Sequence, residues 1–325
     1  MSPLLRKFLQ FAAAATAASM LSHAACAVDY PTRPVRVVVP YVPAGGTDIF
    51  ARMVGSYLSE RLGQQFVIEN RPGAASNIGT EEVVRAPPDG YTLLMVDSTP
   101  TINATLYTKL NFNFIRDTAA VAAIVRVPQV VVLHSSVPAK TFPEFVAYAK
   151  TNPGRLNFGS GGSGSPIHMA VELFKKMANV NLVHVPYRGG GAAVVDLLSG
   201  QIQVMFAAVA SSIEYIRAGS LRPLAVTTAT RSALLSDLPT VADYVPGYEA
   251  SFFVGLVAPR NTPAEIIDRL NKEVNLGLAH PRSKALIADL GAEMLPGSPA
   301  DFGKLIAAET EQWAKAVKFA GIKVE

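Results

Sequence analysis

The chain has 325 residues, of which 50% are hydrophobic and 17% are charged, a composition typical of a globular protein that can bury a core. This length allows two domains of ordinary size. The formal net charge is only +4, and the sequence has no dense patch of Lys and Arg, which argues against a nucleic-acid-binding protein.

The N-terminus has the features of a secretory signal peptide over residues 1–27. Arg6 and Lys7 precede an apolar, alanine-rich stretch at residues 8–21, and Ala25-Cys26-Ala27 has the small-x-small form of a cleavage site. We expect cleavage near Ala27 and an exported protein that needs no disulfide, because Cys26 is the only cysteine. Lipoprotein processing at Cys26 stays open as an alternative. No later segment is long and apolar enough to predict a membrane span.

Strands and helices alternate in the first part of the chain. A continuous apolar run at residues 35–40 predicts a strand buried on both faces. Residues 41–46 interrupt this run with Pro and Gly, and Thr47 is placed to cap the next helix. The alternation then continues with a helix over residues 49–62, strands over 66–69 and 91–96, and a loop over 70–79 that leads into a short helix. This order predicts a mainly parallel sheet with helices on both faces.

A second alternating set begins after two apolar segments, residues 121–127 and 130–133. Thr141 and Glu144 form a capping box that predicts a helix reaching Lys150. The remaining elements are expected as strands over residues 155–158, 182–186, 202–206 and 221–227, and as helices over residues 167–179 and 192–199. These elements predict a second α/β sheet.

The C-terminal part is expected to return to the first sheet. An apolar run at residues 251–258 is followed by amphipathic helices that begin near Pro263 and Pro299, without a complete β-α-β set of their own. We therefore expect two α/β domains with a cleft between them, joined by crossings near residues 121–127 and 251–257. The predicted boundaries assign residues 28–127 plus 252–325 to the first domain and residues 128–251 to the second.

A run rich in Gly and Ser, residues 159–165, lies between a predicted strand and a predicted helix. Bare backbone N–H groups and the positive end of a helix favour an anion at such a place. The run contains G-x-G-x-x-G, but the acid that binds the ribose in dinucleotide folds is missing, because no Asp or Glu lies between Glu172 and Asp196. A P-loop motif is also absent. We therefore expect no nucleotide cofactor, and a tight turn without a ligand remains the alternative.

Motifs for catalysis and metal binding are not found. The sequence lacks G-x-S-x-G, and no histidine after residue 27 has a metal-ligand spacing to a second His or Cys. An exported hydrolase would need Ser163 within hydrogen-bond reach of His168 or His184, with an acid behind the histidine. His168 could contact an anion or merely cap its helix, whereas His184 is expected within a buried strand. We predict no catalytic residue, no metal and no cofactor.

Three glycine loops share one placement in the predicted fold. Gly45-Gly46, the run at residues 159–165, and Gly189-Gly190-Gly191 each follow a strand and precede a helix, where open α/β sheets bind ligands. Ser163 and Ser165 would add hydroxyl donors to the backbone N–H groups. Together these donors can replace water around an anion without a full countercharge.

Other polar residues near these loops have more than one possible role. Arg188 is either a cation near the cleft or a member of a surface ion pair. Asp48 would repel an anion, so we expect it to cap its helix, accept from a ligand amine or orient a water. Four further residues end loops of the first domain and could complete the wall of the cleft: Ser76, Asn77, Ser98 and Thr99.

Ordered motifs from Tyr30 to the C-terminus give the chain a specific family resemblance. The motifs are YPTRPVR at residues 30–36, VPYVPAGGTD at 39–48, ENRPGAASNIG at 69–79, PPDGYTL at 87–93, GSGGSGSPIH at 159–168, VPYRG at 185–189, and LVAP at 256–259 with TP at 262–263. On these motifs the chain resembles the Bug family of periplasmic solute-binding proteins, the TctC-like receptors of tripartite tricarboxylate transporters.

The resemblance implies an α/β fold of the two-domain periplasmic binding protein kind, type II-like, a Venus flytrap with two crossing strands as its hinge. It implies a receptor that captures a small organic carboxylate and delivers it to an inner-membrane transporter of the tripartite tricarboxylate type, or else a ligand-binding component of a sensory system. We expect a monomer that binds no nucleic acid. The loops at residues 41–48 and 161–165 would pinch the ligand from opposite domains. The expected ligand-binding residues are Tyr41, Ala44, Gly45, Gly46, Asp48, Ser76, Asn77, Ser98, Thr99, Gly161, Gly162, Ser163, Gly164, Ser165, His168, Tyr187, Arg188 and Ala207.

The chain departs from the family pattern at two places. Ala207-Ala208 stand where Asp commonly follows the strand, and Phe252-Phe253 occupy a position where Trp is frequent. The lost polar group argues against an amino-acid-like ligand and favours a less polar pocket. We therefore expect an aromatic, dicarboxylic or otherwise apolar-bodied acid, without a further prediction of its identity or of the open or closed state of the empty protein.

Overall fold

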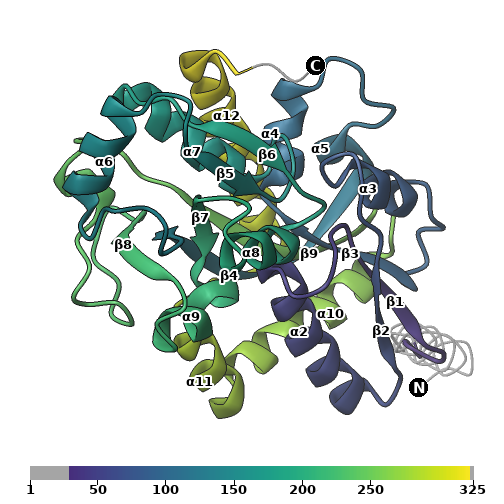
Figure 1. Ribbon diagram of the computed structural model, residues 1–325. Coiled ribbons are helices and arrows are strands. Elements are labelled where there is room, and N and C mark those ends of the chain that lie inside the picture. Colours follow the sequence, from purple (N-terminus) through teal and green to yellow (C-terminus); the bar gives the residue numbers. More distant parts are fainter. Residues whose placement is uncertain (1–28, 323–325) are drawn as a thin grey trace, which may run out of the picture. The chain divides into compact units, whose positions relative to one another are not determined.

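The computed structural model describes residues 29–322 (Figure 1). The predicted signal peptide with Cys26 lies outside these residues. Within residues 29–322, no helix combines the length and the apolar character that a membrane crossing requires.

One long strand, β4 (Thr118–Leu133), organises the sheet, whose strand order is β2-β1-β3-β9-β4-β7-β5-β6. The sequence predicted two separate segments here, but the structure runs straight through Pro128. Proline has no N–H for a strand ladder, and Pro128 stands where β4 changes neighbours. Before it β4 pairs antiparallel with β9 (Ser251–Pro259), and after it with β7 (Val204–Ala208) and β8 (Arg222–Val226).

We call the part of the sheet before β4 and β9, with its helices, the first lobe. Its strands β1 (Val35–Val39), β2 (Phe66–Asn70) and β3 (Thr92–Asp97) are parallel, as the sequence predicted, and β3 pairs antiparallel with β9. Its helices are α2 (Gly46–Leu62), α3 (Asn77–Val84), α4 (Thr99–Leu106), α5 (Phe114–Asp117), α10 (Ala264–Ala279), α11 (Pro281–Asp289) and α12 (Pro299–Ala320), and the short β10 (Glu293–Met294) pairs with β4.

The second lobe is built on the other half of β4. Here β5 (Asn157–Ser160) and β6 (Val183–Pro186) are parallel, and β7 joins them to β4. The helices of this lobe are α6 (Phe142–Thr151), α7 (Pro166–Ala178), α8 (Gly190–Leu198) and α9 (Val209–Arg217), with a short 3₁₀ turn at Val241–Asp243. The strands β4 and β9 are the two crossings between the lobes, as predicted (Figure 1). The exact domain boundaries remain a prediction.

Each lobe has its own hydrophobic core. In the second lobe, Phe142, Phe158, Phe174 and Phe206 are buried together around the sheet. In the first lobe, Phe302 of α12 packs edge-on against Phe253 of β9, with ring centroids 5.4 Å apart. The C-terminal helices therefore return to cover the first sheet, as the sequence predicted.

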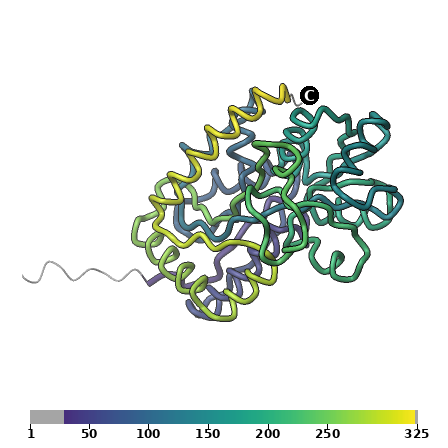
Figure 2. The backbone as a smooth tube through the Cα atoms, turned by 90° about the vertical axis from the view of Figure 1, so that its left-hand side faces the viewer, coloured from purple at the N-terminus to yellow at the C-terminus, as the bar shows by residue number. Residues whose placement is uncertain are grey.

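Helix α12 also contacts the second lobe. Its Trp313 shares a buried cluster with Ile102 of α4 and Met169 of α7. Figure 2 shows α12 (yellow) running along one side of the molecule. The C-terminal helix thus links elements of both lobes beside the hinge strands.

Several local predictions were wrong in detail. Thr47 does not cap α2, because the N-cap is Gly45 and the Thr47 hydroxyl donates to Asp97 instead. Thr141 caps α6 as predicted, but its partner Glu144 accepts from the N–H of Lys140, so the capping box is only half formed. Helices α4 and α5 were not predicted, since each is short and α4 contains Pro100.

Candidate functional site

A small cavity lies between the two lobes at the carboxyl ends of the parallel strands. Its volume is about 30 Å³, close to the room that one water molecule needs. The lining residues are Tyr41, Gly45, Gly46, Thr47 and Asp97 from the first lobe, Phe252 from β9, and Gly161, Ser165, Pro166, Ile167, Gly190, Ala208 and Ser211 from the second lobe. Residues of all three predicted glycine loops therefore meet at one place.

Four helices begin at this cavity: α2, α7, α8 and α9. Helix α2 starts after Gly45, α8 after Gly189 and α9 after Ala208, and none of these three helices has a side-chain hydrogen bond at its N-cap. Only α7 is capped, by the hydroxyl of Ser165, which accepts from the N–H of His168 at 3.3 Å. The first N–H groups of a helix need an external acceptor, and its dipole favours negative charge there. None of the described lining residues is Lys, Arg or His, so backbone dipoles are the groups of this lining that could attract an anion.

The glycines let these loops approach backbone to backbone. A Cβ on Gly191 would lie only 2.7 Å from the carbonyl oxygen of Pro43, and one on Gly164, whose φ is 94°, would lie 2.5 Å from Oδ1 of Asn103. The N–H of Val42 in the first lobe donates to the carbonyl of Arg188 in the second lobe at 3.1 Å. The lobes are therefore closed on each other in this conformation.

Asp97 is a lining residue that the sequence analysis missed. It ends β3 and is buried, and its carboxylate accepts from the hydroxyl of Tyr41 at 2.9 Å and the N–H of Thr99 at 2.8 Å. Burial raises the pKa of the Asp97 carboxyl above its ordinary value, although the donors from Thr99, Tyr41 and Thr47 act in the opposite direction. The available signal was its position at the carboxyl end of a parallel strand.

Two histidines support the glycine run of the second lobe. His168 Nδ1 accepts from the N–H of Gly164 at 3.1 Å, and the His168 and His184 rings stack with centroids 4.0 Å apart. His184 Nε2 lies 2.6 Å from Oγ of the buried Ser160, which also accepts from the N–H of Gly162. Burial lowers the pKa of His168 to about 3 and of His184 to about 4, so both rings are neutral near pH 7. These side chains hold the loop that the ligand would contact.

The geometry does not assemble the nucleophile that a hydrolase would need. His184 pairs with Ser160, which is fully buried, rather than with Ser163. The carbonyl of Ser163 accepts from the hydroxyl of Tyr107 at 3.0 Å, a contact that ties the glycine run of the second lobe to α4 of the first. The described residues also contain no cluster of three or more His, Cys, Asp or Glu that could hold a metal ion.

Several predicted residues lie beside the cavity and do not line it. The Asp48 carboxylate accepts from Arg52 at 2.8 Å and from the N–H of Ala44 at 3.0 Å. Burial alone would raise the pKa of Asp48, but hydrogen bonds from Arg52, Asn70 and Ala44 outweigh it and lower the pKa. Asp48 therefore fixes the first glycine loop. Ser98 likewise binds Glu309, whereas Asn77, Thr99 and Ala207 are buried in the walls behind the cavity.

A neighbouring cavity of about 270 Å³ shares Tyr41 and Gly161 with the first. It contains Arg188, Tyr187 and Ser76, which the sequence analysis also selected. Ser76 is the last of three consecutive non-glycine residues with positive φ, at 45°, 48° and 69° for Ala74, Ala75 and Ser76. Such backbone is strained and is frequent at binding sites. The predicted residues that line a cavity thus divide between two adjoining cavities.

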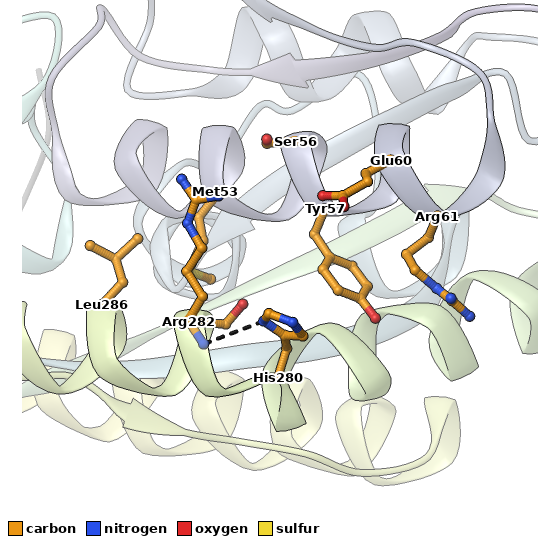
Figure 3. A pocket seen from close by; sticks show the side chains of 9 residues that line it. Met53, Ser56, Tyr57, Glu60, Arg61, His280, Arg282 and Leu286 are labelled. Carbon is orange, nitrogen blue, oxygen red and sulfur yellow. Dashed lines mark hydrogen bonds between the residues drawn. The ribbon is translucent and has the colours of Figure 1, made fainter.

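A larger hollow of about 450 Å³ lies on the first lobe between α2 and α11 (Figure 3). Tyr57, Glu60 and Arg61 of α2 face His280 and Arg282, and His280 Nδ1 accepts from the N–H of Arg282 at 3.3 Å. The side chain of His280 already caps α11, so this hollow offers no group of uncapped helix starts. Although this hollow is larger than the cavity between the lobes, charged, polar and apolar side chains alternate in its lining, as on an ordinary protein surface.

Comparison with known proteins identifies the family of this chain. Residues 50–322 match the TctC family model, described as "Tripartite tricarboxylate transporter family receptor". The chain is 33% identical to protein BugT of Bordetella pertussis over 91% of this chain and 92% of that protein. A structure of an R. palustris protein with adipate has 38% identity and a TM-score of 0.88, covering 90% of this chain and 99% of that one. The structure of MatC from Rhodopseudomonas palustris with bound malate has 29% identity and a TM-score of 0.85, covering 89% of this chain and 100% of that one. The chain therefore belongs to the Bug/TctC family of periplasmic solute-binding receptors.

Proposed function

We propose that this protein captures a small organic carboxylate between its two lobes and delivers it to an inner-membrane transporter of the tripartite tricarboxylate type. The observation that carries the proposal is the meeting of three helix starts without side-chain caps at one cavity. A carboxylate there would accept the N–H groups that no side chain of the protein accepts.

The apolar part of the cavity supports an apolar ligand body. Ile167 and Phe252 line it, and the ring of Tyr41 forms part of the same wall. Relatives with bound adipate and malate support the carboxylate class. We infer an aromatic or aliphatic acid whose carboxylate is held by the helix starts and whose body contacts these side chains.

The lobes must part for this ligand to enter. A cavity of about 30 Å³ is an order of magnitude below the ~300 Å³ or more of typical ligand pockets. The strands β4 and β9 are the connections about which such an opening would turn. We expect the ligand to occupy the space that opens between the glycine loops and to be enclosed when they approach again.

Thermal unfolding of the purified mature protein tests this function. At a hundredfold excess over its Kd, a bound carboxylate should stabilise the folded state by about 2.7 kcal/mol, which raises Tm by several degrees. The panel should contain benzoate, hexanoate, adipate, malate, citrate, aspartate and glutamate, with the corresponding amides of the monocarboxylates as uncharged controls. Stabilisation by the amides as well as the acids would contradict an anion site, and no response to any acid would refute the proposed function. A response to citrate and acidic amino acids alone would refute the apolar ligand body.

The transporter partner is tested separately. Co-expression with membrane subunits of the tripartite tricarboxylate type should give ligand uptake that depends on this protein. Uptake that is the same without it, with ligand-dependent binding to a membrane sensor instead, would assign the protein to a sensory system.

A further inference from the structure

The cavity between the lobes contains one charged side chain among its described lining residues, and that residue is an acid. Asp97 is 5% exposed at the end of β3. The rest of the lining is glycine, hydroxyl and apolar. A site that attracts a carboxylate through helix starts therefore also contains a buried carboxyl group.

The contacts of Asp97 leave one of its two carboxylate oxygens with capacity for a further hydrogen bond. Oδ1 accepts two donors, the hydroxyl of Tyr41 and the N–H of Thr99, which fill its two lone pairs. Oδ2 accepts only the hydroxyl of Thr47, at 3.2 Å, which is longer than the usual 2.5–3.0 Å of an O–H···O bond. Tyr41 and Thr47 both line the cavity together with Asp97, so both oxygens border it, and Oδ2 is the one that keeps capacity for another donor.

No cation balances Asp97 among its described partners. Its contacts are the hydroxyls of Tyr41, Thr47 and Thr99, one N–H group and the cavity wall. Arg188 lines the adjoining cavity and not this one. A buried carboxylate without a countercharge repels a second negative group and attracts a hydrogen-bond donor, and both effects grow as water is excluded.

We propose that Asp97 sets the ligand class of this receptor: a monocarboxylate that carries a hydroxyl or ammonium donor at the end facing Oδ2, with dicarboxylates selected against. The inference rests on the proposed function, because it assigns the second end of the same ligand. The ligand would bridge the cavity, with its carboxylate at the helix starts and its donor at Asp97. Burial raises the pKa of Asp97, which means that its charged form is already disfavoured. A second carboxylate beside it would disfavour that form further, so this shift also argues against a dicarboxylate.

Asp97 also has a structural role that the test must separate. Its contacts with Tyr41 and Thr47 attach the first glycine loop to β3. Asp97→Asn keeps an acceptor for Tyr41 and Thr99 and replaces the open oxygen by an NH₂ group, which can donate to a ligand carboxylate. The expected result is thus a reversed ligand preference, which a purely structural residue would not produce.

Binding titration with two matched ligand series tests the inference. One series is hexanoate, 6-hydroxyhexanoate, 6-aminohexanoate and adipate, and the other is the benzoates with 4-hydroxymethyl, 4-aminomethyl and 4-carboxylate groups beside benzoate itself. In at least one series, the natural protein should bind the hydroxyl or ammonium member at least tenfold more tightly than the dicarboxylate. Asp97→Asn should shift this ratio at least tenfold toward the dicarboxylate.

Asp89→Asn is the matched control. Asp89 lies just before the amino end of the same strand, where it accepts from Arg33 and from the N–H of Tyr91. The Asp89→Asn variant loses the same charge at the opposite end of β3, so the ratio of the two affinities should stay unchanged. A ratio that changes equally in both variants would overturn the assignment, because the effect would then reflect net charge.

A second measurement uses the natural protein alone and does not depend on the folding of the variant. Calorimetry in two buffers of different ionisation enthalpy at pH 7 should show uptake of close to one proton with a dicarboxylate and none with 6-hydroxyhexanoate. Tyr41, the titratable group in contact with Asp97, stays protonated because burial raises its pKa well above the usual value.

The remaining outcomes separate the two proposals. Tight dicarboxylate binding without proton uptake, lost in Arg188→Gln, would place the second carboxylate in the adjoining cavity and overturn the role of Asp97 while leaving carboxylate capture intact. No binding of any acid in either series would overturn both.

Discussion

Three N-cap residues carry the functional argument at the scale of single side chains. Helices prefer Ser, Thr, Asp or Asn at the N-cap, yet α2, α8 and α9 have Gly45, Gly189 and Ala208 there. Replacing a favourable N-cap residue by Gly or Ala costs between a few tenths of a kcal/mol and about 2 kcal/mol of stability. The three helix starts line one cavity, so under the proposed function this loss of local stability coincides with a gain in anion affinity.

A capping side chain placed at Gly45 should compete with the ligand. The φ of −80° at Gly45 suits any residue, and a Cβ there would lie 3.6 Å from the amide nitrogen of Gly191, an ordinary contact. In Gly45→Asp the new carboxylate can accept from α2 and from the second lobe. We expect a higher Tm of the empty protein and at least a hundredfold weaker ligand binding by titration calorimetry.

Gly45→Ala is the control for this variant, because it adds the Cβ without the charge. The Kd of this variant for the ligand should stay within about tenfold of that of the natural protein, which corresponds to about 1.4 kcal/mol of binding free energy. Equal losses in the Asp and Ala variants would show that space, and not the helix start, governs binding.

The histidine pair predicts a specific pH dependence of stability. Both pKa values are lowered on folding, from an ordinary value near 6.5 to about 3 for His168 and about 4 for His184. The unfolded chain therefore binds more protons between these values, so the pair stabilises the fold fully above pH 6.5 and loses that contribution as the pH falls toward 4. The free energy of unfolding should decrease over this range.

Urea unfolding of His184→Gln at pH 7 and pH 4.5 measures the contribution. The variant should lose less stability between the two pH values than the natural protein. His134→Gln, which changes a histidine bound to Ser136 away from the glycine run, should keep the natural slope. An unchanged slope in His184→Gln would contradict the proposed role of this ring.

The two acids of the first lobe show how far residue-level prediction could go. Asp48 was predicted either to fix its helix start or to act near the ligand, and its carboxylate pairs with Arg52 at i+4, a pairing that the spacing alone could have indicated. Asp97 directly follows the strand predicted over residues 91–96, but only the next two residues, Ser98 and Thr99, were selected there. The glycines were found correctly as loops at helix starts, since their pattern depends on the backbone and not on side-chain direction. Tertiary contacts decide which acid faces the cavity, and the sequence pattern does not contain those contacts.

At the scale of elements, the C-terminal helix is joined to the hinge by one buried acid. Glu309 of α12 accepts from Ser98 at 3.2 Å, from Trp313 Nε1 at 3.0 Å and from Arg126 of β4 at 3.0 Å. Ser98 in turn accepts from the N–H of Phe253 in β9 at 3.2 Å. Helix α12 is thereby tied to both crossing strands and to the loop beside Asp97.

Removal of this acid should destabilise the protein strongly. Glu309→Ala leaves Arg126, Ser98 and Trp313 without their acceptor, and breaking a buried ion pair costs about 3–5 kcal/mol. Arg126 is 29% exposed, so water can take part of the loss, and we expect about 2–4 kcal/mol by urea unfolding.

Glu311→Ala is the matched control on the same helix. Its ion pair with Lys315 is exposed, and solvent screens such pairs, so Glu311→Ala should change the free energy of unfolding little. Similar losses in the two variants would contradict the importance of the Glu309 network.

The elements themselves were largely predictable, and the exceptions have physical reasons. Periodicity found β1, α2 and α7 because each has a clear apolar pattern and a glycine or serine at its start. It divided β4 at Pro128, since a proline ordinarily ends a strand unless the ladder changes partners there. His184 was expected in a buried strand, but β6 ends the strand order of the sheet, and its side chains are partly exposed.

At the scale of the whole molecule, the lobes meet through backbone groups. The Val42–Arg188 hydrogen bond and the contact of Tyr107 with the carbonyl of Ser163 both cross the cleft. The order of the strands was not predicted. The two crossings followed from the sequence, because alternating elements restrict the topology. The closed state did not, because a few polar contacts decide it.

The most direct test of the account is a crystal structure of the protein with the tightest-binding carboxylate from the ligand panel. The account predicts that the ligand carboxylate lies between the lobes, with its oxygens about 2.9 Å from backbone nitrogens at the starts of α2, α8 or α9. A carboxylate held instead by Arg188 in the adjoining cavity, or in the hollow beside His280, would contradict the central claim that uncapped helix starts form the binding site.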